Sequence, residues 1–251
     1  MHAAQDAACA SDKTGIRAAI EYVIDGDTVI LGDGEHLRMV GIDTPELGHG
    51  NTPDQPGAAA ARDWLRARLT PGTPVLTVAD TEDRDRHGRL LRHLFLSDGT
   101  NLQAGLLAEG LATPLVIPPS LRYLPCYQHA ADAALGAQTG LWGRREYQSA
   151  DPETLAPDTR GFRIIRDRVM QVHWTRGGAW LELSGPVSVT IPAANFSEFD
   201  RKVIAALPGQ RVEFRGMVYP QSGRLRLYLR HPVNLRAPAD PGNSVAPDKS
   251  K

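Results

Sequence analysis

The chain has 251 residues, of which 41% are hydrophobic, and its formal net charge at pH 7 is −1. This length supports one large domain or two small ones, and no apolar run is long enough for a transmembrane helix. The small net charge hides an asymmetry. Residues 16–145 carry 12 Lys/Arg against 16 Asp/Glu, whereas residues 159–236 carry 13 against 5. An acidic half joined to a basic half predicts two units with separate tasks, and a basic unit can bind polyanions.

Alternating apolar residues, turn signals and amphipathic stretches define the expected elements of a first unit, residues 16–145, which follows an N-terminal arm, residues 1–15. Strands are predicted at 16–24, 29–31, 36–42, 74–80 and 90–96. Helices are predicted at 58–69, at 101–109, and from 126 to about 140. The DGDT segment at 25–28 and the GDGE segment at 32–35 are predicted to be turns between strands.

A charged, proline-containing segment, residues 146–160, is the expected linker to a second unit, residues 161–236. The second unit is predicted to contain strands at 161–175, 179–185 and 186–192, a helix at 196–207, and strands at 210–220 and 224–232. Three strands, a helix and two strands form the element order of an OB-fold, a small five-stranded barrel. The tail, residues 237–251, has the composition of a disordered segment.

Two cysteines, Cys9 and Cys126, are present without the spacing of a zinc site. They are either free thiols or one disulfide that closes a loop of about 120 residues. The small polar segment around Cys9 is a poor place for a buried thiol, which favours the disulfide and an oxidising compartment. The N-terminus has neither a basic region nor an apolar region of a leader. We therefore expect either a cytoplasmic protein or, preferably, a secreted or periplasmic one in its mature form.

Three charged segments end predicted strands: VIDGDTV at 23–29, LRMVGIDTPE at 37–46 and DRDRHGRLL at 83–91. Carboxylates without His or Cys suit a hard, oxygen-seeking cation such as Ca²⁺. Arginines nearby suit a phosphate, because the guanidinium fork matches its oxygens. A remaining glutamate can activate water. Together the segments favour a phosphoryl-transfer site. Its candidate residues are Asp25, Asp27, Arg38, Asp43, Glu46 and Arg89.

These motifs, with the helical LLAEGLA at 106–112, resemble the staphylococcal-nuclease-like family, or thermonucleases, over residues 16–142. The resemblance implies an α+β fold that is mainly β: an OB-type five-stranded barrel with three helices, here followed by a second small OB-like barrel. It also implies Ca²⁺-dependent hydrolysis of phosphodiesters in single-stranded or breathing DNA and RNA, leaving 3′-phosphates. DNA and RNA are then the substrates, and no obligate protein partner is evident.

The resemblance also implies individual roles. Asp27 and Asp43 would hold Ca²⁺ through their side chains and Thr44 through its backbone carbonyl, with Asp25 in support. Arg38 and Arg89 would hold the scissile phosphate, and Glu46 would activate or orient the attacking water. Further substrate contacts are expected from Arg86 and His87. Where the family's type member has two tyrosines, this chain has Val116 and Pro118, which predicts weaker base stacking.

Two alternatives remain at this point. The first is a catalytically silent nucleic-acid-binding module of the same fold. Such a module would lack arginines or carboxylates of the site, whereas all of these residues are present here. The second is a surface protein whose acidic cluster binds Ca²⁺ only for stability. The second unit is also open to two interpretations. Its aromatic and arginine residues either form a single-strand groove or are core residues and solvated strand positions.

Overall fold

The computed structural model describes residues 9–11, 14–150 and 152–236. The chain divides into two compact units, residues 1–148 and 149–251. No helix within the described residues is long and apolar enough to cross a membrane.

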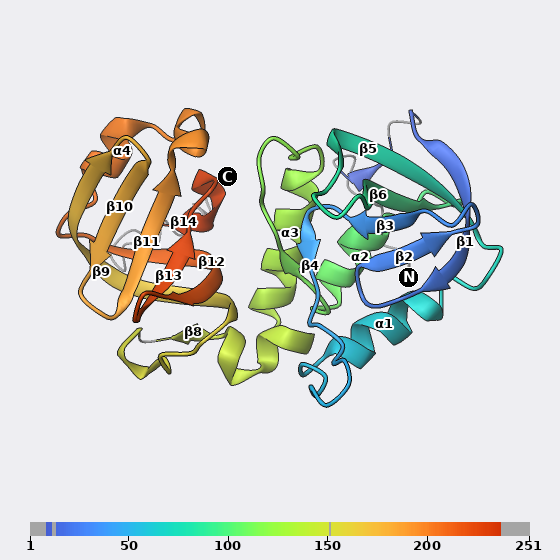
Figure 1. Cartoon of the computed structure of the whole chain (residues 1–251), viewed down its shortest axis with the longest axis horizontal. Helices are drawn as coiled ribbons and strands as arrows, with labels where there is room; N and C mark the ends of the chain where they lie inside the picture. Colours follow the sequence, from blue (N-terminus) through green and yellow to red (C-terminus); the bar gives the residue numbers. More distant parts are fainter. Residues whose placement is uncertain (1–8, 12–13, 151, 237–251) are drawn as a thin grey trace, which may run out of the picture. The chain divides into compact units, whose positions relative to one another are not determined.

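The first unit is built around a closed barrel with the strand order β1-β2-β3-β6-β5 (Figure 1). Its strands are β1 (Ile16–Val23), β2 (Thr28–Leu31), β3 (His36–Met39), β5 (Pro74–Arg84) and β6 (Leu90–Leu96). β3 and β6 pair in parallel, and the other pairs are antiparallel. The barrel confirms the fold expected for residues 16–145.

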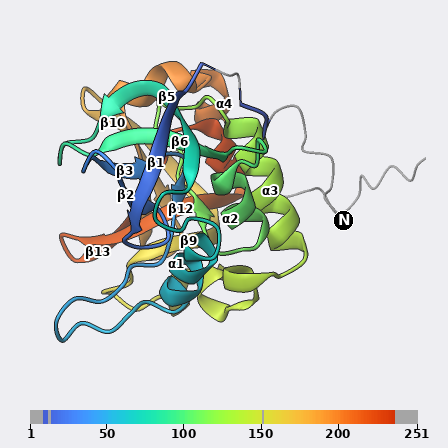
Figure 2. The ribbon, with the colours of Figure 1, turned by 90° about the vertical axis from the view of Figure 1, so that its right-hand side faces the viewer.

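Three α-helices of the described first unit pack on this barrel: α1 (Ala58–Arg66), α2 (Leu102–Ala108) and α3 (Leu124–Gly136). Figures 1 and 2 show α2 and α3 side by side, and α2 also contacts β6. The core between barrel and helices contains fully buried Leu37, Leu94, Phe95, Leu106 and Leu107. Leu37 and Met39 alternate with less buried residues in β3, and Leu106 and Leu107 lie on one face of α2, which are the patterns that predicted these elements. Leu94 and Phe95 are consecutive in β6, and both are buried.

The strand predicted at 36–42 is interrupted. β3 ends at Met39, and β4 (Ile42–Asp43) pairs instead with β7 (Thr113–Pro114). Gly41 causes the break: its φ is +85°, and a Cβ there would lie 2.6 Å from Cε2 of Tyr127. A residue with a side chain would be strained in this conformation and would clash with the ring. The turn at Gly41 therefore takes Asp43 out of the barrel and into a separate two-stranded ladder.

A disulfide joins Cys9 to the buried Cys126 on α3, across a sequence separation of 117 residues. It confirms the pairing expected from the sequence. A covalent closure of this length is expected to stabilise the fold mainly by restricting the unfolded chain.

Replacing both cysteines with serine should therefore lower the free energy of unfolding by about 2–4 kcal/mol. Urea unfolding of the wild type and of the Cys9→Ser/Cys126→Ser variant, each with and without reductant, would measure this. Reductant should affect the wild type alone. Titration of two free thiols in the native, unreduced wild type would contradict the pairing.

The second unit is a second five-stranded barrel. Its strands are β9 (Gly161–Thr175), β10 (Gly178–Leu183), β11 (Val187–Pro192), β12 (Arg211–Gln221) and β13 (Arg224–Tyr228). β11 and β13 pair in parallel, and β12 closes the ring by pairing with both β13 and β9. This is the topology expected of an OB-like barrel.

Two short strands extend the second sheet: β14 (Leu235–Arg236) pairs with β12, and β8 (Ser149–Ala150) pairs in parallel with β9. Part of the segment expected as a linker thus belongs to this sheet. The helix predicted at 196–207 is divided into a 3₁₀ helix, η5 (Ala193–Glu198), and a short α4 (Arg201–Ala205). Asp200 divides them, because its backbone is extended and its carboxylate accepts the amide of Lys202, 2.8 Å away, as an N-cap.

Candidate active site

The DGDT turn between β1 and β2 presents Asp27. An Oδ1 atom of Asp25 accepts the amide of Asp27 at 3.0 Å, and the carbonyl of Thr28 accepts the amide of Asp25 at 3.3 Å. Such Asx-type hydrogen bonds fix tight turns. Asp25 therefore stabilises the turn that presents Asp27.

Gly26 brings this turn against a neighbouring segment. A Cβ on Gly26 would lie 2.6 Å from Cβ of Ala61 on α1 and 2.7 Å from Oγ1 of Thr44. Only a glycine allows this approach. The carboxylate of the next residue, Asp27, consequently reaches Thr44: its Oδ2 accepts both the amide and the hydroxyl of Thr44, each at 3.0 Å. Asp27 is 4% exposed.

Arg38 connects the two carboxylates that were expected to hold a cation. Its Nη2 lies 2.9 Å from Oδ2 of Asp27 and 3.1 Å from Oδ1 of Asp43. Its Nη1 donates to the carbonyls of Met39 at 2.8 Å and Ile42 at 3.1 Å. The guanidinium is thus held at four points, and both carboxylates contact a single nitrogen atom. Asp27 from the turn before β2, Arg38 from β3 and Asp43 from β4 thus converge.

Asp85 holds the second arginine. Its Oδ2 accepts Nε of Arg89 at 2.8 Å, and its Oδ1 accepts the backbone amides of His87 at 2.9 Å and Arg89 at 3.0 Å. Partial burial acts to raise the pKa of Asp85, but these hydrogen bonds and the charge of Arg89 outweigh burial, so its pKa lies below the ordinary value. Asp85 stays ionised and fixes Arg89 in place.

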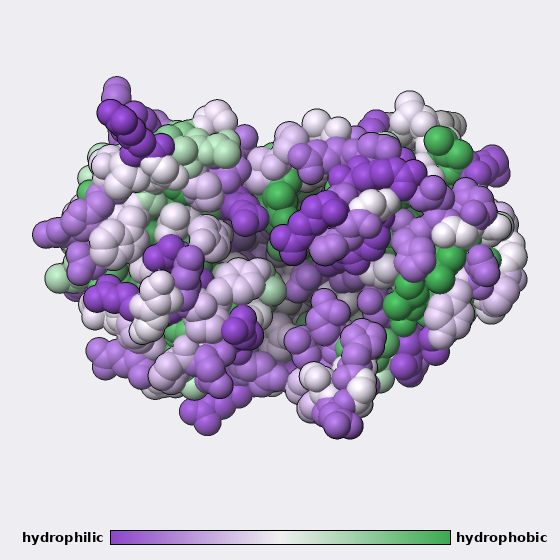
Figure 3. All heavy atoms as spheres, in the orientation of Figure 1, coloured by the Kyte–Doolittle hydropathy of each residue, from purple (hydrophilic) through white to green (hydrophobic). Residues whose placement is uncertain are grey.

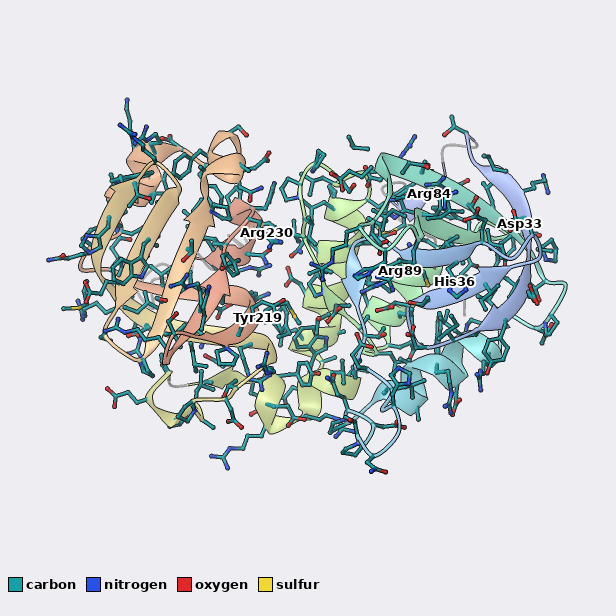
Figure 4. The ribbon with its side chains drawn as sticks, in the orientation of Figure 1. Asp33, His36, Arg84, Arg89, Tyr219 and Arg230 are labelled. Atoms are coloured by element: carbon teal, nitrogen blue, oxygen red, sulfur yellow. A yellow bond between two sulfur atoms is a disulfide. The ribbon has the colours of Figure 1, made fainter. Side chains whose placement is uncertain are left out.

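A pocket of about 420 Å³ has both arginines, Arg38 and Arg89, in its wall. It lies between the β3–β4 segment and the hairpin of β5 and β6. Arg84 also lines it, and Figure 4 labels Arg84 and Arg89 on the barrel. The face of the first unit visible in Figure 3 is mostly hydrophilic. Further lining residues include Glu82, Arg86, His87, Leu115, Ile117 and Ser120.

The pocket brings Arg86 and His87 beside the two arginines, with Nε of Arg86 3.0 Å from Nε2 of His87. The sequence places Val116 and Pro118 at the positions of the family's two tyrosines, but other apolar residues form the pocket wall. Leu115 and Ile117 line the pocket, whereas Val116 points into the protein and is 7% exposed. Successive residues of an extended segment face opposite sides, so the neighbours of Val116 face the pocket in its place. Aliphatic side chains stand there in place of stacking rings.

Glu46 begins an irregular loop that is closed by Gln55. The amide of Glu46 donates to Oε1 of Gln55 at 3.1 Å, and the amide of Gln55 donates to the carbonyl of Glu46 at 2.9 Å. Within the described residues, no hydrogen bond or ion pair holds the Glu46 carboxylate. Burial, followed by the charges of Asp27 and Asp25, raises its pKa. The main chain is therefore fixed, while the carboxylate is available to a ligand.

Asp43 has the most strongly shifted carboxyl group of the site. Burial raises the pKa of Asp43 to about 6, the positive charge of Arg38 opposes this, and the carboxylates of Asp27, Glu46 and Asp25 add to it. Burial and three like charges thus outweigh the ion pair with Arg38. Such a carboxylate accepts a proton, or an additional cation, near neutral pH.

The donor set fits a hard divalent cation. Asp27 and Asp43 already converge on one positively charged group, and both supply oxygen. In the described part of the chain, no three His, Cys, Asp or Glu side chains form a closed metal cage. Ca²⁺ and Mg²⁺ do not require one, because they accept waters and carbonyls as further ligands. Thr44 contributes its amide and hydroxyl to Asp27 in this structure.

The barrel of the first unit carries a cluster of arginines and carboxylates next to a pocket that the two arginines line. Comparison with known proteins identifies the family. The family described as "Staphylococcal nuclease homologue" matches residues 36–144. The thermonuclease of Staphylococcus intermedius is 35% identical over 137 residues, which cover 53% of this chain and 80% of that protein.

The thermonuclease of Staphylococcus hyicus is also 35% identical, over 123 residues that cover 48% of this chain and 72% of that protein. Endonuclease YncB of Bacillus subtilis (strain 168) is 28% identical over 141 residues, covering 55% of this chain and 66% of that protein. The chain belongs to the staphylococcal nuclease family. The family match lies within the first unit.

Proposed function

We propose that this protein is a Ca²⁺-dependent nuclease that hydrolyses single-stranded or breathing DNA and RNA and leaves 3′-phosphates. The observation that carries the proposal is the position of Arg38. Its guanidinium joins Asp27 and Asp43 and also lines the pocket that contains Arg89. A phosphodiester in this pocket would contact the guanidinium groups of Arg38 and Arg89, next to the carboxylates of Asp27 and Asp43.

In this proposal Arg38 and Arg89 bind the non-bridging oxygens of the phosphate and stabilise the charge that increases on them in the transition state. Asp85 keeps Arg89 oriented. Glu46 accepts the proton of the attacking water or orients that water. A raised pKa brings its basicity closer to neutral pH, which improves a general base.

Ca²⁺ would be held by Asp27 and Asp43, with the carbonyl of Thr44 as a further ligand. When bound, it would polarise the phosphate and keep water molecules in its coordination shell. Asp25 supports this site through the turn that presents Asp27.

Heat-denatured DNA should release acid-soluble nucleotides in the presence of Ca²⁺, and EGTA should stop the release. Phosphate analysis of the products should find 3′-phosphate ends, and RNA should be cleaved as well. A folded wild type that binds Ca²⁺ and oligonucleotide but cleaves neither polymer would contradict the proposal. That result would instead support the silent binding module or the Ca²⁺-stabilised surface protein.

Ca²⁺ binding should depend on pH through Asp43. With a pKa of about 6 in the folded chain, against an ordinary value of 3.8, Asp43 binds its proton more tightly when folded. The metal-free protein should therefore lose this contribution to stability as pH rises from about 4 through 6. Ca²⁺ requires the ionised carboxylate, so its affinity should increase over the same range.

Thermal unfolding between pH 4.5 and 8, with and without Ca²⁺, would test this. The increase in Tm caused by Ca²⁺ should be small at pH 4.5 and complete near pH 7.5. The Asp43→Asn variant, which has no titrating group at this position, should show a weak effect of Ca²⁺ throughout. An equal increase in Tm at pH 5 and 7.5 in the wild type would contradict the assignment.

We further propose that the protein functions outside the cytoplasm. The disulfide between Cys9 and Cys126 supports this, because structural disulfides persist in oxidising compartments. Fractionation of cells that produce the full-length protein, followed by thiol labelling, should find it oxidised and exported. A reduced protein confined to the cytoplasm would contradict the proposal.

A further inference from the structure

The second unit has a row of side chains across the outer face of its barrel. Trp180 on β10 is the register partner of His173 on β9 and of Thr190 on β11, and Thr190 is the partner of Tyr228 on β13. Register partners in adjacent strands lie on the same face of a sheet. The residues that alternate with the row are buried, namely Ala179, Leu181, Val189, Ile191, Leu227 and Leu229. The row therefore faces outward.

The rings in this row are arranged for stacking. His173 and Trp180 lie with their centroids 5.1 Å apart and their planes at 28°, and Trp180 remains 36% exposed. The guanidinium of Arg230 lies 5.6 Å from the ring centroid of Tyr228. Three strand spacings of about 4.8 Å separate β9 from β13, so the row is about 14 Å long. RNA-binding sheets of similar width stack two or three bases on such rings.

A carboxylate compensates two arginines of this unit. On β9 and β12, Arg166 and Arg215 each form an ion pair with Glu213, at 2.6 Å. The arginines of β13 and of the residues just after it differ, because no carboxylate of the described residues lies within ion-pair distance of them. These are Arg224, Arg226 and Arg230. They leave uncompensated positive charge beside the row of rings.

Most acidic side chains of this unit have other tasks. Asp167 is buried and accepts hydrogen bonds from Ser184 and from the amide of Gly185, and Asp200 caps α4. Glu182 is the carboxylate nearest the row, and its Oε2 lies 3.5 Å from Nε2 of His173. The face thus combines the exposed ring of Trp180 and the half-buried rings of His173 and Tyr228 with arginines that have no ion-pair partner among the described residues, and its charge favours a polyanion that carries flat groups.

We propose that the outer face of β9, β10, β11 and β13 binds single-stranded nucleic acid. Its bases would stack on Trp180 and Tyr228, and its phosphates would contact the arginines of β13. This site rests on the proposed function in one respect: it would give the nuclease a second binding site for its substrate. Since both units belong to one chain, a strand held here raises the local concentration of phosphodiesters for the first unit.

The test measures the Kd of the full chain for a fluorescent oligothymidylate in EGTA, over a series of salt concentrations. Trp180→Ala should weaken binding at least about fivefold, because stacking of one base contributes on the order of 1–3 kcal/mol, and Trp180→Phe should restore it. Arg226→Ala should reduce the salt slope by about 0.7, the value for one phosphate of a single strand. Arg211→Ala removes an exposed arginine outside the row and should leave the slope unchanged.

Two results would overturn the proposal. One is that Trp180→Ala and Arg226→Ala bind like Arg211→Ala while circular dichroism shows that all remain folded. The other is that an abasic oligonucleotide of the same length binds as tightly as oligothymidylate, which would identify a general polyanion surface. Because binding is measured in EGTA, a wild type that fails to cleave would leave this test intact. With Ca²⁺, Trp180→Ala should raise KM for long single strands and keep kcat on a short chromogenic phosphodiester.

Discussion

Glu46→Ala should lower the rate of DNA cleavage by about 10²- to 10⁴-fold, the contribution typical of a positioned general base. Unlike the carboxylates of Asp25, Asp27, Asp43 and Asp85, the Glu46 carboxylate has no hydrogen-bond or ion-pair partner among the described residues, while its main chain is held by Gln55. The substitution should therefore change chemistry with little effect on the fold. Ca²⁺ should still raise Tm, because Asp27 and Asp43 are intact.

Glu46→Gln separates the two roles proposed for this residue. Glutamine can orient water through a hydrogen bond, but it cannot accept a proton at neutral pH. Activity near that of the wild type would assign Glu46 to orientation, and a loss equal to that of Glu46→Ala would assign it to proton transfer. Glu82→Gln is the matched control, because Glu82 is an exposed carboxylate in the wall of the pocket that Arg38 and Arg89 line. Full cleavage by Glu46→Ala would remove Glu46 from the mechanism.

The sequence predicted the features that depend on local patterns. Alternating apolar residues located the strands of both barrels, because one face of each strand is buried. The motifs around Asp27, Arg38 and Asp43 were expected to form one site, and these residues meet in the structure, although Asp43 lies on β4, outside the barrel. The disulfide followed from the unfavourable environment of Cys9.

The remaining features depend on contacts between distant segments. The turn at Gly41 packs against the ring of Tyr127, 86 positions later, and this contact is not visible in the periodicity of 36–42, which predicts one strand. The ion pair between Arg38 and Asp27 likewise depends on the register of β2 and β3. The charge compensation of Arg166 by Glu213 likewise depends on the pairing of β9 with β12.

Asp85 is a different case, because a local signal for it existed. Asp85 and Arg89 are four residues apart in DRDRHGR, and an aspartate at the start of a tight turn commonly accepts the following amides. The density of charge in this segment concealed the pair, since five of the six other residues are also charged or histidine. In the structure Asp85 is distinguished from its neighbours because its carboxylate accepts the turn amides of His87 and Arg89.

Arg38→Ala should have the second large effect, on stability as well as activity. In the metal-free protein this arginine is the positive partner of two carboxylates, and its side chain is only 13% exposed. Removing it leaves the buried Asp27 without its counter-charge, which typically costs about 3–5 kcal/mol. Cleavage should fall by about 10³-fold or more, because a group that stabilises the charge of the transition state is lost.

The two effects respond differently to Ca²⁺. Ca²⁺ replaces the missing positive charge between Asp27 and Asp43, so it should increase Tm more in Arg38→Ala than in the wild type, while cleavage stays low. Arg38→Lys keeps one charge but cannot contact two carbonyls and two carboxylates at once, so it should recover stability better than activity. Arg84→Ala is the control, because Arg84 lines the same pocket but pairs with the exposed Glu35. Normal cleavage by Arg38→Ala in saturating Ca²⁺ would show that Arg38 only stabilises the metal-free fold, and the phosphate would then have to be bound by Arg89 alone.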